Sequence, residues 1–138
     1  MELYIGGTAQ GKKAYVTQVR GIEETRIWDN FEVWFREKLQ ENCVESVNEQ
    51  MSQKHSETVD MQPTQNHQEP LSPEEECLAY LKAHPDTVLI CDEVGNGIVP
   101  LDPFEREYRE RLGRLLCEIA ANAERVERIV CGIGQRIK

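Results

Sequence analysis

The sequence predicts one α/β domain in which helices flank a mainly parallel β-sheet. Its 138 residues are typical of a single domain. Short apolar runs alternate along the chain with segments of helical periodicity, which is the order of strands joined by crossover helices. The clearest run, residues 87–91, is almost uniformly apolar, as expected of a strand that is buried on both faces of a parallel sheet.

The first 42 residues predict two strands, each followed by a helix. Residues 3–5 form a short apolar strand that leads into glycines, and a short helix is expected over residues 12–19. Residues 26–29 form the second expected strand, and residues 31–40 form the second expected helix. This order starts the strand–helix alternation of an α/β fold.

Residues 43–71 are polar and lack aromatic side chains, and we predict a disordered insertion here within one domain of residues 1–138. Residues 41–76 hold nine acidic residues against one lysine, so they account for most of the net charge of −9. Such a composition buries too little apolar surface to offset chain entropy. His55 and His67 lie inside it with no carboxylate or cysteine at ligand spacing, which predicts solvated side chains rather than metal ligands.

Two N-terminal capping boxes mark helices in the second half of the chain. Residues 72–75, Ser-Pro-Glu-Glu, start a helix that is expected to end near His84. Residues 102–105, Asp-Pro-Phe-Glu, start the longest helix, which is expected to run to about Asn122. Residues 126–131 form the last expected strand, placed nearer a sheet edge because charges interrupt it. The buried face of the long helix is predicted to comprise Phe104, Tyr108, Leu112, Leu115, Leu116 and Ile119.

Charge and hydropathy exclude several classes of protein. No block of basic residues could follow the phosphates of a nucleic acid, so no nucleic-acid partner is expected. The longest aliphatic run, Val88–Ile90, is far shorter than the roughly 20 residues of a membrane span, so none is expected. The N-terminus carries no export signal, and we expect a cytoplasmic protein.

The five cysteines favour structural thiols over disulfides or a metal site. Their number is odd, and none is spaced as C-x-x-C, which argues against a disulfide framework or a zinc ribbon. Cys91, Cys117 and Cys131 lie within apolar patterns and are expected in the core.

A glycine-rich turn near the N-terminus nearly matches the phosphate-binding loop G-x-x-x-x-G-K-[ST]. Its glycines would let backbone N–H groups converge on phosphate oxygens at the start of the following helix. Lys12 is placed to reach the β- and γ-phosphates, whereas Lys13 stands where a hydroxyl normally holds Mg²⁺. A plain turn is the alternative interpretation. The nucleotide-binding residues predicted here are Gly6, Gly7, Thr8, Ala9, Gln10, Gly11, Lys12 and Lys13.

An apolar strand that ends in adjacent acids predicts the partner of this loop. Asp92 and Glu93 follow the run at residues 87–91, which is the Walker B arrangement. An acid at the carboxyl end of a strand can hold Mg²⁺, and its neighbour can orient or deprotonate an attacking group. We therefore predict Asp92 as the metal ligand and Glu93, with Lys12, as catalytic. The alternative is that the two acids only begin a solvated loop.

Two further glycine-rich loops are candidates for the rim of the site. Gly95 and Gly97 flank an asparagine after the acidic pair, and they are predicted to approach the nucleotide closely. Residues 132–134, Gly-Ile-Gly, follow the last expected strand and should lie at the same end of the sheet. In both cases a plain connection is the alternative.

These residues together resemble the adenosylcobinamide kinase / adenosylcobinamide-phosphate guanylyltransferase family of cobalamin (vitamin B12) nucleotide-loop assembly. The resemblance is strong over residues 87–138 and extends to the N-terminal loop, and more loosely to residues 28–31. The segments that carry it are Asp92–Pro100, Tyr108-Arg109-Glu110, Gly113-Arg114, Cys131–Lys138, and Gly6-Gly7 with Gly11-Lys12.

The resemblance implies a P-loop fold related to the RecA type, ATP or GTP with Mg²⁺, a corrinoid substrate and a homo-oligomer, often a trimer. It places Lys12 on the phosphates and Glu93 with residues 95–97 at the active site. The sequence departs from the family at Lys13, where a hydroxyl is expected, and at Asp92, where asparagine is common. The family's segment with the histidine that becomes guanylylated is nearly absent.

The leading hypothesis is a nucleotide-binding transferase that phosphorylates adenosylcobinamide, with transfer of GMP to the resulting phosphate as a second reaction. The alternative is a nucleotide- or corrinoid-binding partner or regulator of the same family that has lost catalysis. Lys13 and the shortened histidine segment favour this alternative.

Overall fold

The sheet has five strands and places its parallel strands side by side in the order β2-β3-β1-β4, with β5 at one edge. The computed structural model describes the backbone of residues 1–53 and 71–138, and their side chains except those of residues 44–53. β5 runs antiparallel to β4, and all other pairs are parallel. The strands are β1 (Glu2–Gly6), β2 (Ile27–Trp28), β3 (Val88–Asp92), β4 (Arg125–Val130) and β5 (Ile133–Arg136).

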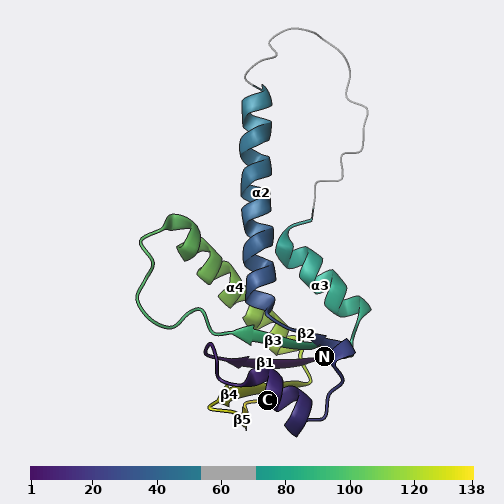
Figure 1. Cartoon of the computed structure of the whole chain (residues 1–138). Coiled ribbons are helices and arrows are strands. Elements are labelled where there is room, and N and C mark those ends of the chain that lie inside the picture. The colour runs from purple at the N-terminus through teal and green to yellow at the C-terminus, as the bar shows by residue number, and fades with distance from the viewer. Residues whose placement is uncertain (54–70) are drawn as a thin grey trace.

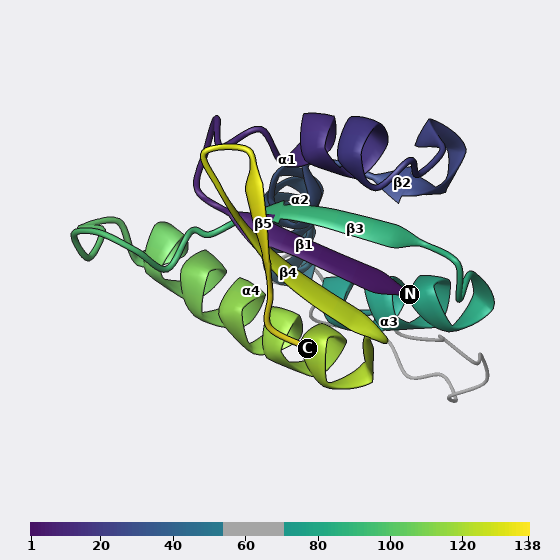
Figure 2. The same cartoon turned by 90° about the horizontal axis from the view of Figure 1, so that it is seen from below.

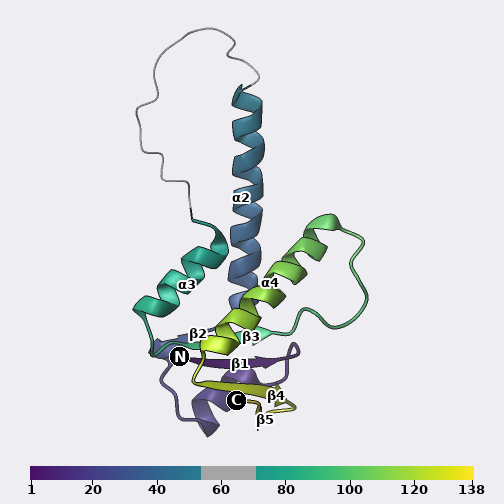
Figure 3. The same cartoon turned by 180° about the vertical axis from the view of Figure 1, so that it is seen from behind.

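Helices cover both faces of this sheet, as Figures 1 and 2 show. One face carries α2 (Phe31–Gln53), α3 (Pro73–Ala83) and α4 (Pro103–Asn122). The other face carries α1 (Lys12–Ala14), which continues as the π-helical turn η1 (Tyr15–Val19). A short 3₁₀ turn, η2 (Glu24–Arg26), precedes β2. In the view from behind, α3 and α4 flank the base of α2 (Figure 3).

Strand alternation divides the core between the two faces. Leu3 and Leu89 pack with Phe31 and Leu112 under the three long helices. The neighbouring Tyr4 packs with Val16, together with other residues, under η1. This arrangement confirms the predicted α/β class, a mainly parallel sheet of the P-loop NTPase type flanked by helices. No helix of the described residues is long and apolar enough to cross a membrane.

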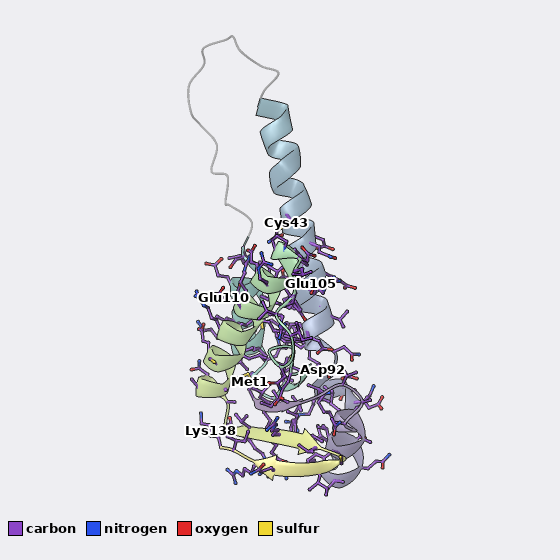
Figure 4. The ribbon with its side chains drawn as sticks, turned by 90° about the vertical axis from the view of Figure 1, so that its left-hand side faces the viewer. Met1, Cys43, Asp92, Glu105, Glu110 and Lys138 are labelled. Atoms are coloured by element: carbon purple, nitrogen blue, oxygen red, sulfur yellow. The ribbon has the colours of Figure 1, made fainter. Side chains whose placement is uncertain are left out.

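The first predicted capping box is confirmed and the second is only half formed. Ser72 accepts from the backbone N–H of Glu75, whose carboxylate accepts in turn from Ser72. Asp102 caps α4 by accepting from the N–H of Phe104 at 3.0 Å. Glu105 does not complete the second box, because its carboxylate accepts from Arg36 of α2 at 3.0 Å, and Figure 4 shows Glu105 beside that helix.

One predicted boundary is wrong. The insertion was expected from residue 43, but α2 continues to Gln53, since no glycine or proline interrupts residues 41–53. The remainder of that prediction, residues 54–70 with His55 and His67, lies outside the described residues. β4 lies one strand in from the sheet edge, in agreement with its predicted place nearer an edge. The edge strand itself was not predicted: residues 133–136 turn back as β5 after a tight turn with positive φ at Cys131 and Gly132.

The cysteine prediction is right for Cys91 and wrong for two others. Cys77 and Cys91 are buried, whereas Cys43, Cys117 and Cys131 are exposed. Cys117 lies on the outer face of α4, away from its buried stripe, and Cys131 lies in the β4–β5 turn. Burial raises the pKa of the Cys77 thiol to about 12 and raises that of Cys91 as well.

Thiol labelling tests this division. We expect three of the five thiols to react in the folded protein and all five in denaturant, because burial keeps Cys77 and Cys91 both inaccessible and protonated. A colorimetric assay at pH 8 counts the reactive thiols, and mass spectrometry of the labelled peptides shows which cysteines they belong to. Protection of Cys117 or Cys131 in the folded monomer would contradict the fold.

Candidate functional site

The carboxyl ends of β1 and β3 lie side by side and bring the two predicted motifs together. Their parallel register pairs Gly6 with Asp92, so the loop after β1 starts beside the acids that end β3. In open α/β sheets, ligands bind at this edge. Figure 4 shows Asp92 at the boundary between the helical layer and the N-terminal segment.

Lys12 is buried and anchored at this edge. Its side chain is only 8% exposed, and its Nζ donates to the carbonyl of Gly7 at 2.9 Å and to that of Gly6 at 3.4 Å. The same ammonium group forms an ion pair with Oδ1 of Asp92. A buried lysine is stable only when its charge is compensated, and here two carbonyls and one carboxylate do this.

Asp92 is held from three directions. Besides Lys12 on Oδ1, Thr8 donates its hydroxyl to Oδ2 at 2.6 Å. The backbone N–H of Asp92 donates to Glu32 of α2 at 3.0 Å. Sequence reasoning missed Glu32, and the available signal was an acid in the first turn of the helix after the neighbouring strand.

The loop itself is shaped by its backbone and joined to the β4–β5 turn. Gly11 and Ala9 have positive φ values of 78° and 59°. The carbonyl of Gln10 accepts from the N–H of Gly132 at 2.8 Å, and its side-chain oxygen accepts from the N–H of Cys131 at 2.6 Å. The structure therefore brings Gly132 to the loop, as predicted. Residues 133 and 134 do not belong to that rim, because they lie in β5.

Glu93 lies on a different side of the same edge. Arg128 contacts its carboxylate at 3.0 Å, and Asn96 donates to it at 2.8 Å. Together with Gly95 and Arg109 these residues line a hollow of about 410 Å³ between β4, α4 and the loop after β3. Gly97 is exposed and does not line the hollow.

Two arginines of α4 give the loop after β3 its shape. Arg109 donates to the carbonyls of Asn96 and Ile98, and Arg106 donates to those of Pro100 and Leu101. The side chains of Ile98 and Leu101 project into solvent. Hydrogen bonds from the two arginines therefore hold the backbone of this loop. The apolar side chains of Ile98 and Leu101 remain exposed in the described chain.

Lys13 does not compete for the position beside Asp92. It is 53% exposed, and its Nζ lies 3.5 Å from Oδ2 of Asp29, at the end of β2. β2 is separated from β1 by β3, so this cation is directed to the far side of the acidic strand.

The donor set fits Mg²⁺ only when a nucleotide accompanies it. Among residues 1–53 and 71–138, no three acidic, cysteine or histidine side chains gather to hold a metal ion. Mg²⁺ is commonly bound through one or two carboxylates together with substrate phosphates. Asp92 and the hydroxyl of Thr8 supply oxygen donors of this type beside a loop suited to phosphate.

A buried carboxylate fastens the helix after the loop to the sheet. Glu127 of β4 is 1% exposed and accepts from the hydroxyl of Tyr15 at 2.8 Å and from Arg125. Arg20 lies 3.8 Å from it. Burial raises the pKa of Glu127, but the hydrogen bonds from Tyr15 and Arg125 and the arginine charges outweigh this, and its pKa ends below the usual value.

A second and larger hollow among the described residues lies elsewhere and contains none of the predicted site residues. It measures about 670 Å³ and is lined by residues of β2, the end of α3 and the segment before β3, including Trp28, Tyr80 and His84. These residues lie toward the amino ends of the parallel strands, away from the loop and from Asp92.

Comparison with known proteins identifies relatives of this chain. The family model described as cobinamide kinase / cobinamide phosphate guanyltransferase matches residues 12–137. The bifunctional adenosylcobalamin biosynthesis protein CobU of Salmonella typhimurium is 45% identical over 51 residues, which cover 37% of this chain and 28% of the relative. The protein of the same name from Escherichia coli matches with the same identity and coverage. The aligned stretch is thus well under two thirds of either relative.

Replacing Gly6 tests the close approach on which the loop depends. A Cβ at Gly6 would clash with the carbonyl of Ile129 in β4, so Gly6→Ala should lower the free energy of unfolding by about 2 kcal/mol. Gly113→Ala is the matched control. It lies on the exposed side of α4 with nothing near its Cβ, and it should stabilise by about 0.5–1 kcal/mol. Urea denaturation measures the free energy of unfolding of both variants. Equal changes in the two variants would contradict the close approach of Gly6 to Ile129 in β4.

Acid should weaken the contribution of Glu127. Its lowered pKa means that the carboxylate stabilises the fold above pH 4.5, its ordinary pKa, and that this contribution is lost as the pH falls further. At pH 7, Glu127→Gln should cost about 2 kcal/mol, because it leaves the partly buried Arg125 and Arg20 without their anion. The exposed Glu124→Gln should change stability by less than about 0.5 kcal/mol. Denaturation should show that the difference in free energy of unfolding between the wild type and Glu127→Gln is smaller at pH 4 than at pH 7. An equal difference at both pH values would disprove this role.

Proposed function

Because the chain belongs to the cobinamide kinase / cobinamide phosphate guanyltransferase family, we propose that it binds ATP or GTP with Mg²⁺ and phosphorylates adenosylcobinamide in cobalamin biosynthesis. The observation that carries the proposal is the meeting of Lys12 and Thr8 with Asp92 at the carboxyl ends of β1 and β3. It combines an anion-binding loop, a cation and an acidic metal ligand in one place.

The loop and Lys12 would bind the phosphates. In the structure Lys12 is paired with Asp92, so binding requires its ammonium group to exchange that carboxylate for phosphate oxygens. Asp92 would then be free to hold Mg²⁺, which would supply positive charge against the negative charge that develops during transfer. Other backbone N–H groups of the loop would supply further donors to the phosphates.

In this proposal Glu93 serves the acceptor. Arg128 and Asn96 hold its carboxylate beside the hollow of about 410 Å³, where a hydroxyl of the corrinoid can enter. In the transfer, the acceptor oxygen forms a bond to the γ-phosphorus while the bond to the β-phosphate oxygen breaks. The nucleoside diphosphate leaves with that electron pair, and Glu93 accepts the hydroxyl proton.

Kinase activity is better supported than GMP transfer. Among the described residues the one histidine is His84, which stacks on Tyr80 at the end of α3. His84 therefore lies toward the amino ends of the strands and far from the loop. No described histidine is near enough to the loop to carry a guanylyl group during GMP transfer.

The second candidate is a binding module of the same family that has lost catalysis. It is favoured by Lys13, which replaces the hydroxyl expected beside the metal, and by the pairing of Lys12 with Asp92. This candidate retains ligand binding and forms no product.

Exposed apolar residues of the loop after β3, such as Ile98 and Leu101, support the further proposal of a homo-oligomer.

Phosphoryl transfer can be tested with γ-labelled ATP or GTP, Mg²⁺ and adenosylcobinamide, by following label into the corrinoid. Lys12→Ala and Glu93→Gln should each reduce kcat by about a hundredfold or more, because each removes a charge that stabilises or serves the transition state. Lys38→Ala, a half-exposed lysine of α2 outside the site, should retain full activity.

Circular dichroism must show that the variants are folded. Label transfer that persists in both site variants would rule out the assignment of roles. Saturable nucleotide binding without any product would favour the binding module instead.

A further inference from the structure

A hydroxyl is present beside Asp92 although the phosphate-loop pattern lacks one at position 13. Thr8 donates its Oγ1 proton to Oδ2 of Asp92 at 2.6 Å, across 84 residues of sequence. This length is that of a charge-assisted O–H···O⁻ hydrogen bond. The hydroxyl of Thr17, by contrast, is turned into its own helix, where it donates to the carbonyl of Lys13 at 3.0 Å.

The two oxygens of Asp92 have different partners. Oδ1 pairs with the buried ammonium of Lys12, and Oδ2 accepts from Thr8. Lys13 takes no part, because its side chain is drawn to Asp29 at the end of β2. The side chain of residue 13 therefore points to Asp29, and the hydroxyl that contacts Asp92 comes from Thr8, at the start of the same loop.

We infer that Thr8 supplies the hydroxyl of the metal–nucleotide site in place of residue 13, and that it acts as a positioning residue for Asp92. The inference rests on the proposed function. It assigns to Thr8 the part that the phosphate-loop pattern gives to the serine or threonine after its lysine.

The geometry is consistent with this part. A hydroxyl has one proton and two lone pairs, so a threonine that donates to a carboxylate still offers an oxygen to a cation. Thr8 lies between Gly7 and Ala9, and the loop turns directly after it, at Ala9, which has a positive φ of 59°. Lys12 can leave Oδ1 for phosphate while Thr8 continues to orient the carboxylate through Oδ2.

A thermodynamic consequence distinguishes this part from mere loop structure. If Thr8 orients the metal ligand, it strengthens nucleotide binding only when Mg²⁺ is present. The quantity to measure is the ratio of the Kd for nucleotide in EDTA to the Kd in Mg²⁺. This ratio reports the coupling between metal and nucleotide and does not depend on turnover.

The experiment is isothermal titration calorimetry of the full chain with ATP and with GTP, in EDTA and in Mg²⁺. Thr8→Val keeps the shape and removes the hydroxyl, Thr8→Ser restores it, and Thr17→Val removes a hydroxyl elsewhere in the same segment. We expect Thr8→Val to lower the ratio roughly tenfold, as fits the loss of one hydrogen bond to a charged group, with little change in the Kd in EDTA. Thr8→Ser and Thr17→Val should keep the wild-type ratio.

The outcomes separate the two proposals. A wild-type chain that binds nucleotide, together with Thr8→Val that keeps the full ratio, would overturn the inference and leave the proposed function standing. Equal weakening in EDTA and in Mg²⁺ would also overturn it, since Thr8 would then only shape the loop. A folded wild-type chain that binds neither nucleotide would refute the proposed function, and the inference with it.

Discussion

The parallel pairing of β1 with β3 is the constraint on which the rest of the site depends. It aligns Gly6 with Asp92 and so joins two segments that are more than 80 residues apart in sequence. Hydrogen bonds along both strands fix this register, and a shift by one residue would turn the side chain of Asp92 to the other face of the sheet. Lys12 could then no longer be neutralised in its buried position. The charge of the lysine and the register of the strands thus support each other.

A second set of contacts joins the loop after β1 to β4 and to the β4–β5 turn. Gln10 joins it to the β4–β5 turn through two hydrogen bonds, and Tyr15 joins the helix that follows to Glu127. Gly6 has no space for a side chain against β4. Gly6 and Gln10 are therefore held against β4 and the β4–β5 turn, while Thr8 contacts Asp92 at the end of β3.

Local patterns in the sequence were sufficient to predict most of the helices and parallel strands, and that the loop after β1 and the acids after β3 lie at one end of the sheet. The capping residues Ser72 and Asp102 marked α3 and α4, and the apolar run before Asp92 marked β3. Features that depend on distant contacts were not accessible in this way. Whether Glu105 bonds to its own helix or to Arg36 is decided by how α2 packs against α4. β5 was missed because Ile133–Arg136 contains a glycine and polar residues, and it forms a strand only by pairing with β4.

The two edges of the sheet also limit how copies of this chain can come together. The strand at one edge, β2, is two residues long, and the strand at the other, β5, ends in exposed Gln135 and Arg136. Short edges and cationic edges both oppose the addition of further strands from another molecule, the step from which aggregates grow. Contact between copies through the sheet edges is thereby disfavoured, and the apolar side chains of the loop after β3 remain exposed without the sheet itself becoming a template.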